Sequence, residues 1–198
     1  FSQNFMIKIV NMKGMSVYPI FKNGHSSIVQ YAKDNNCKWL LNEQCKRTNP
    51  ITVFLRKPHE RFISGVHTYI EHERRKLLVK AYTHKNEDKG FLTFDYEPIL
   101  NKIQQGAITN EHFMPQHTWL KKLHHYYRGI LILKTVNDLR MMIDNRNGPN
   151  IPAMSLSRRQ RIAKIDVDLR EDNILYNNYV GAHIPIDTLM KDIEHVLS

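Results

Sequence analysis

Apolar residues in this chain alternate between short dense runs and longer stretches in which they recur at every third or fourth position. The dense runs Val17–Phe21, Ile51–Leu55 and Gly129–Leu133 are rich in aliphatic and aromatic residues, which is typical of buried strands. The helical spacing predicts helices at residues 28–33, 60–76, 96–105, 117–126, 136–144 and 187–197. Because strands alternate with helices, we expect an α/β fold with a P-loop-like, mostly parallel sheet flanked by helices.

Three shorter segments carry weaker patterns. Cys37–Leu41 is predicted as a short strand, and the polar stretch Tyr82–Gly90 as a surface loop. Ser155–Lys164 contains several basic residues and is predicted as a basic loop or helix start.

Length and composition favour one soluble domain over residues 1–198. The chain has 198 residues, 41% of them hydrophobic, which is enough for one substantial core. No run of about 18 apolar residues is present, so no membrane span is expected. The first residues, FSQNF, lack the pattern of a secretory signal, and only Cys37 and Cys45 are present, spaced too far apart for a CxxC motif. We therefore expect a cytoplasmic protein with two ordinary thiols.

The charge balance favours an anionic partner. Lys and Arg outnumber Asp and Glu by 29 to 19, which gives a net charge of +10. A nucleotide, a nucleic acid, an acidic glycan and a membrane surface are all compatible with this charge.

The segment KNGHSS at residues 22–27 is a candidate anion-binding loop between a strand and a helix. Gly24 lets the backbone approach an oxyanion, and the first turn of the following helix leaves N–H groups unpaired. Ser26 and Ser27 add hydroxyl donors, and Lys22 adds a positive charge. The loop is not that of the nucleotide kinases, because GxxxxGK[ST] is absent and the lysine precedes the glycine. A capped helix start without a ligand would use the same serines.

A second cation is expected near this loop. If Val17–Phe21 and Ile51–Leu55 are parallel neighbours, Lys22 and Arg56 leave the same edge of the sheet and converge on one polyanion.

Three motifs, in this order, resemble those of the PAPS-dependent sulfotransferases, in particular the carbohydrate sulfotransferase branch. FKNGHSS (21–27) resembles the 5′-phosphosulfate loop, although it departs from the family at His25. LRKPHERFIS (55–64) resembles the 3′-phosphate motif, and HFMPQ (112–116) resembles the HWxPQ of that branch. The resemblance extends over roughly residues 16 to 180.

The resemblance implies a cofactor, a reaction and a set of site residues. The cofactor would be 3′-phosphoadenosine 5′-phosphosulfate (PAPS), the product adenosine 3′,5′-bisphosphate, and the acceptor a hydroxyl group, in that branch of a carbohydrate. Lys22 would bridge the leaving phosphate and the sulfuryl group, and Arg56 and Ser64 would bind the 3′-phosphate. The cofactor-binding set is Lys22, Asn23, Gly24, His25, Ser26, Ser27, Arg56 and Ser64. Lys22 and His112 would be catalytic, and no metal and no nucleic acid are expected.

The general base for the acceptor hydroxyl stays open at this point. His112, Glu111, His117 and His25 all qualify chemically. His112 is favoured because it opens the third motif, but a histidine packed against Trp119 and hydrogen-bonded there is equally compatible with the pattern.

Two other functions remain compatible with the sequence. A basic nucleic-acid-binding domain fits the net charge. A P-loop kinase would need an acidic residue at a strand end to hold a metal, whereas Ile51–Leu55 ends in Arg56. The remaining basic cluster, Arg158, Arg159 and Arg161, is either a phosphate contact, a grip on an acidic acceptor or a solvated basic face.

Overall fold

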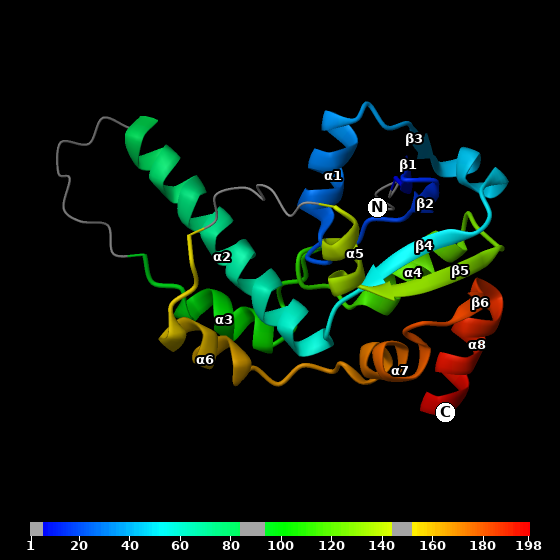
Figure 1. Cartoon of the computed structure of the whole chain (residues 1–198). Helices are drawn as coiled ribbons and strands as arrows, with labels where there is room; N and C mark the ends of the chain where they lie inside the picture. The colour runs from blue at the N-terminus through cyan, green and yellow to red at the C-terminus, as the bar shows by residue number, and fades with distance from the viewer. Residues whose placement is uncertain (1–5, 84–93, 144–151) are drawn as a thin grey trace.

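The computed structural model describes residues 6–83, 94–143 and 152–198, and their strands form one sheet with the order β3-β1-β2-β4-β5-β6 (Figure 1). The central strands β2, β4 and β5 are parallel neighbours, whereas β1, β3 and β6 pair antiparallel. The prediction of a mostly parallel sheet is therefore confirmed only for the centre. The strands are β1 (Lys8–Met12), β2 (Met15–Val17), β3 (Trp39–Leu41), β4 (Ile51–Leu55), β5 (Ile130–Thr135) and β6 (His183–Pro185).

The six predicted helices are present, with boundaries moved by one to several residues. The long helix α2 continues to the edge of a described range, so Tyr82 and Thr83 of the predicted surface loop are helical and the rest of that loop lies outside the described residues. The helices are α1 (His25–Asp34), a short 3-10 helix η1 (Asn42–Arg47), α2 (Pro58–Thr83), α3 (Glu97–Gln104), α4 (Gln116–His124), α5 (Val136–Met142), α6 (Leu156–Ala163), α7 (Arg170–Tyr179) and α8 (Ile186–Leu197).

Helices cover both faces of the sheet (Figure 1). Buried apolar residues of α4, α7 and α8 pack on one face, and those of α1 and α5 pack on the other. A further apolar cluster joins α2, α3 and α6 beside the sheet. Burying both faces explains why β4 reads ITVFL, with all five residues inaccessible to solvent.

The predicted strand Val17–Phe21 is wrong beyond Val17. Only Met15–Val17 is a strand, and it lies parallel to β4 with Val17 opposite Thr52. Pro19 has no N–H to donate to a ladder, so the chain leaves the sheet there. Phe21 consequently faces the aromatic rings around the site instead of the sheet.

The entry into α5 is capped by Thr135 and Asp138. The Thr135 hydroxyl accepts a hydrogen bond from the Asp138 N–H, and the Asp138 carboxylate accepts one from the Thr135 N–H at 2.7 Å. This reciprocal cap starts the helix directly at the end of β5. Four elements, β1, η1, α7 and β6, are not predicted from the sequence.

Among the described helices, none combines the length and the apolar character needed to cross a membrane. Cys37 and Cys45 are not in a disulfide.

Candidate functional site

A cavity of about 400 Å³ lies beyond the carboxyl ends of the parallel strands. Every residue of the predicted site except Asn23 lines it. Helix α2 also contributes Thr68 and His72, and α5 contributes Arg140. The predicted members that line the cavity are Lys22, Gly24, His25, Ser26, Ser27, Arg56, Ser64 and His112.

The backbone of the loop bends sharply before α1. Lys22 has a φ of 68° and Gly24 a φ of 79°, both in the left-handed region. A Cβ atom on Gly24 would lie 2.3 Å from Leu139 Cδ2, so glycine is required by both backbone conformation and space. As the N-cap of α1, Gly24 provides no side-chain cap for the first turn of that helix.

Asn23 supports the loop from behind. Its side chain is 1% exposed, and its amide donates hydrogen bonds to the Phe54 carbonyl at 2.8 Å and to Gln116 Oε1 at 2.6 Å. Asn23 therefore ties the loop to β4 and α4, and it is not among the cavity-lining residues.

The Lys22 ammonium group points toward helix α2. Its Nζ donates to Thr68 Oγ1 at 2.7 Å, and Thr68 in turn donates to the Ser64 carbonyl at 3.0 Å. Burial, together with the charges of Arg56 and Arg61, lowers the pKa of Lys22 to about 8. The group is mostly protonated at neutral pH, yet its charge is poorly compensated, which favours binding of an anion.

Arg56 leaves the end of β4 and reaches the loop. Its Nη1 donates to the Lys22 carbonyl at 3.3 Å, and burial lowers its pKa from the ordinary value. Gln116 clamps its backbone, because Arg56 N donates to Gln116 Oε1 and Gln116 Nε2 donates to the Arg56 carbonyl, both at 2.9 Å. Gln116, in the third motif, thus positions Arg56, in the second motif.

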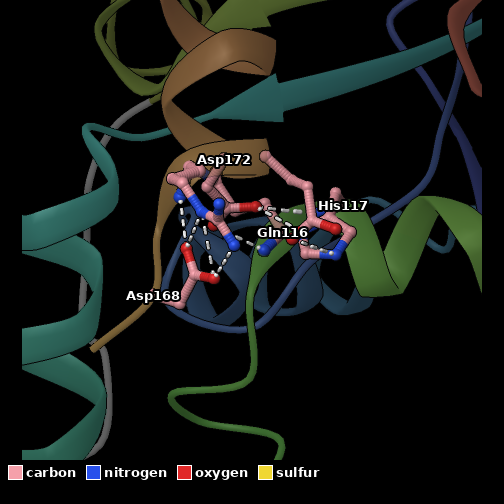
Figure 2. A network of polar contacts seen from close by, with 6 residues as sticks. Gln116, His117, Asp168 and Asp172 are labelled. Carbon is pink, nitrogen blue, oxygen red and sulfur yellow. Dashed lines mark hydrogen bonds and ion pairs between the residues drawn. The ribbon is translucent and has the colours of Figure 1, made fainter. Parts of the chain in front are cut away.

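Figure 2 shows the carboxylate that holds this glutamine and its neighbour. Buried Asp172 accepts from the N–H of Gln116 at 2.7 Å and from the N–H of His117 at 2.8 Å. The His117 ring lies between Asp172 and Glu171, at 3.1 Å from each. His117 is therefore engaged in holding α4 against α7, and it does not line the cavity.

Arg61 braces the same region from inside the protein. It is 1% exposed; its Nε donates to the Phe21 carbonyl at 3.1 Å and its Nη1 to the Met114 carbonyl. Burial lowers its pKa to about 10, an effect that the nearby Asp172 charge opposes. Arg61 fixes the loop and the third motif to each other.

The rings of His25 and His112 both contact the Phe21 ring. His25 contacts it edge-on at 4.4 Å between centroids, and His112 is stacked on it at 5.2 Å. His112 Nδ1 is buried without a hydrogen-bond partner among the described residues. Burial lowers the pKa of each histidine to about 4, so both imidazoles are neutral at physiological pH in the protein without ligand.

The three arginines of the basic cluster on α6 all form ion pairs. Arg158 pairs with Glu71, Arg159 with Glu60 and Arg161 with Glu97. These arginines join α6 to α2 and α3, and none lines the cavity. Glutamates therefore balance their positive charges, and the arginines do not form an unpaired solvated face.

The sequence-based reasoning missed Thr68, His72 and Arg140. Ser64, Thr68 and His72 are spaced by four residues on α2, so one helix face carries all three, and this spacing was a readable signal. Arg140 had no such signal, because its position depends on how α5 packs beside the loop.

The donor set of the cavity suits phosphate oxygens. Lys22, Arg56 and Arg140 supply positive charge, and serine and threonine hydroxyls supply neutral donors. Within the described part of the chain, no acidic side chain lines the cavity.

Comparisons with known proteins found no match, so the proposed function rests on this geometry. The chain matches no protein-family model, and no curated protein or solved structure matches it significantly.

Proposed function

We propose that this protein is a PAPS-dependent sulfotransferase that transfers a sulfuryl group to an acceptor hydroxyl, and that the acceptor is a carbohydrate. The observation that carries the proposal is the convergence of Lys22, Arg56 and Ser64 in one cavity with the start of α1. These residues belong to two motifs separated along the chain, and each has the side chain that the corresponding phosphate requires.

Two anionic ends of the cofactor fit two parts of the cavity. Arg56 and Ser64 would hold the 3′-phosphate, with a guanidinium and a hydroxyl as donors. The first turn of α1, with Ser26 and Ser27, would hold the 5′ end. Asn23 contributes by fixing the loop from its buried side.

PAPS, when bound, supplies an activated sulfuryl group on its 5′-phosphate. Lys22 would supply an ammonium group to the leaving oxygen, and a charge-charge contact that strengthens as negative charge grows there would lower the barrier. A neutral imidazole, from His112 or His25, accepts the proton of the acceptor hydroxyl.

The lining of the cavity favours this function over a P-loop kinase. A kinase site holds its metal through an acidic residue near the phosphates. Among the described residues, those lining the cavity are basic, hydroxylic, aromatic or aliphatic. Each of the three α6 arginines is paired with a glutamate, which lowers the positive charge that this helix could offer to a nucleic acid.

The test compares ligands that differ in one phosphate. Adenosine 3′,5′-bisphosphate should raise the thermal unfolding temperature, whereas 5′-AMP, ATP with magnesium and single-stranded DNA should raise it much less. Calorimetry should then give at least a tenfold preference for the bisphosphate over 5′-AMP, a difference of about 1.4 kcal/mol. Equal affinity for the two nucleotides would contradict the role of Arg56 and Ser64.

A further inference from the structure

A second and larger cavity, of about 870 Å³, adjoins the phosphate-suited one. Phe21 and His25 line both cavities, so these two side chains form the boundary between them. The second cavity is called the aromatic groove below, because the rings of Tyr18, Phe21, Trp39 and Trp119 line it.

The aromatic groove differs from the first cavity in charge. Its charged lining residues in the described chain are Lys8 and Glu111, whose charges cancel. This contrasts with the net charge of +10 of the whole chain. A carboxylated or sulfated ring would lose hydration in the groove without a surplus of positive charge to compensate it.

Only one of the four candidate bases faces both cavities. His112 lines the first cavity, Glu111 lines the aromatic groove, and His117 lines neither. His25 lines both, at the beginning of α1 and in contact with the Phe21 ring. A base must reach a hydroxyl held in one cavity while the group to be transferred is held in the other.

We propose that the aromatic groove binds a neutral sugar ring as the acceptor and that His25 is the base that takes its proton. This inference rests on the proposed sulfotransferase function and specifies its acceptor site. The acceptor oxygen bonds to sulfur while the bond between sulfur and the 5′-phosphate oxygen breaks. The electrons of that bond leave with the phosphate, and the hydroxyl proton passes to His25.

The chemistry of a neutral sugar matches this lining. Its C–H faces pack on aromatic rings, which bury large area at little cost in conformational freedom. Lys8 and Glu111 provide one donor and one acceptor group for its hydroxyls. Burial and the Lys8 charge keep the His25 imidazole neutral, as the removal of a proton requires.

Tryptophan fluorescence reports binding in the groove directly. The chain has two tryptophans, and both line the groove. With adenosine 3′,5′-bisphosphate present, a pool of neutral hexose and N-acetylhexosamine oligosaccharides should change the fluorescence saturably. A matched pool containing uronic acid should bind at least tenfold more weakly. Tighter binding of the acidic pool, or no binding of the neutral pool, overturns the inference.

A groove variant that preserves folding provides the control. Val29 lines the groove and is 38% exposed, so Val29→Glu adds a charge there without burying it. We expect at least tenfold weaker binding of the neutral sugar and unchanged binding of the bisphosphate. Unchanged sugar binding would place the sugar elsewhere.

Histidine resonances test the role of His25 without relying on turnover. The His25 ring signals should shift on addition of either ligand, whereas those of His112 should shift mainly with the bisphosphate. His25→Gln should lower turnover at least a hundredfold, a larger effect than its effect on either affinity. His112→Gln is the matched comparison and should lower turnover less than His25→Gln does. A greater loss in His112→Gln, or a His25 ring insensitive to sugar, overturns the assignment.

The two proposals fail in different ways. If the bisphosphate does not bind, the sulfotransferase function is wrong. If the bisphosphate binds with the expected preference but the neutral sugar does not, only the acceptor assignment is wrong.

Discussion

At the residue scale, the site depends on cations whose positive charge is only weakly balanced by neighbouring groups. Lys22 is hydrogen-bonded to a threonine hydroxyl, and Arg56 to a backbone carbonyl. Burial lowers the pKa of both groups, and neighbouring arginines lower these pKa values further. Such groups gain more from an anionic ligand than solvated surface cations do.

Arg56→Ala should weaken binding of adenosine 3′,5′-bisphosphate by about 2 to 4 kcal/mol, because a charge-assisted and largely desolvated contact is lost. Isothermal calorimetry measures the change. Arg170→Ala is the matched control, since Arg170 is exposed and paired with Asp168 away from the cavity. An equal effect of the two substitutions would contradict the assignment of Arg56.

Lys22→Met should act on turnover more than on binding. The substitution keeps the stem and removes the charge, so turnover should fall by about a hundredfold or more, as for one lost oxyanion donor. Single-turnover kinetics beside a binding isotherm separate the two effects. If binding collapses while the rate at saturation is unchanged, Lys22 is only a ground-state phosphate contact.

The lowered pKa of Lys22 predicts a pH dependence. Below pH about 8 the free protein carries the ammonium form, and above it the charge is lost. The value of kcat/KM for PAPS should therefore fall as pH rises through about 8. In Lys22→Arg the guanidinium stays charged, so this decline should move to higher pH or vanish. An unchanged decline would assign it to another group.

At the element scale, the three motifs are held together by close packing between α2 and the segment before α4. Gly65 lies where α2 crosses this segment, and a Cβ atom there would come within 2.1 Å of the His112 carbonyl oxygen. Arg61 of α2 donates a hydrogen bond to the Met114 carbonyl of the same segment, and Gln116 at the start of α4 accepts one from the Arg56 N–H at the end of β4. The position of His112 thus depends on a small residue on α2.

Gly65→Ala should destabilise the protein by about 1 to 3 kcal/mol, because backbone atoms must move to admit the methyl group. Denaturant unfolding measures the loss. Leu77→Ala, at a 51% exposed position of the same helix, is the control and should change stability by less than about 0.5 kcal/mol. Equal stability of the glycine variant and the wild type would show that the contact is easily relieved.

At the scale of the whole molecule, the neutral histidines connect the site to acid stability. Folding lowers the pKa of His25 and of His112 from 6.5 to about 4. Between these values the unfolded chain binds more protons than the folded protein, so stability falls as pH decreases through this window.

The unfolding temperature should therefore decline between pH about 6.5 and about 4. In the double variant His25→Asn, His112→Asn this decline should be shallower, because two of the responsible groups are absent. Thermal unfolding across the pH range tests the difference between the two slopes. Identical slopes would assign the acid sensitivity to other residues.

Much of the central architecture was predictable from sequence. The run Ile51–Leu55 is a strand within its predicted limits, and the helix predicted from residue 136 begins there, capped by Thr135 and Asp138. Both depend on neighbouring residues alone, through side-chain pattern and capping chemistry. The edge strand His183–Pro185 and helix α7 were not predicted. A three-residue strand has no period of its own, and β6 exists by pairing with β5.

The sequence by itself indicated that Lys22 and Arg56 meet at the phosphate-suited cavity, because the strands β2 and β4 that precede them are adjacent and parallel. Only the tertiary structure decided the roles of the residues around them. It buries Asn23 and His117 in supporting hydrogen bonds, adds Arg140, and places His25 on the boundary of two cavities. The physical reason is that strand ends and turns follow from local chemistry, whereas the side of a packed helix that faces a cavity depends on contacts between residues far apart in the chain.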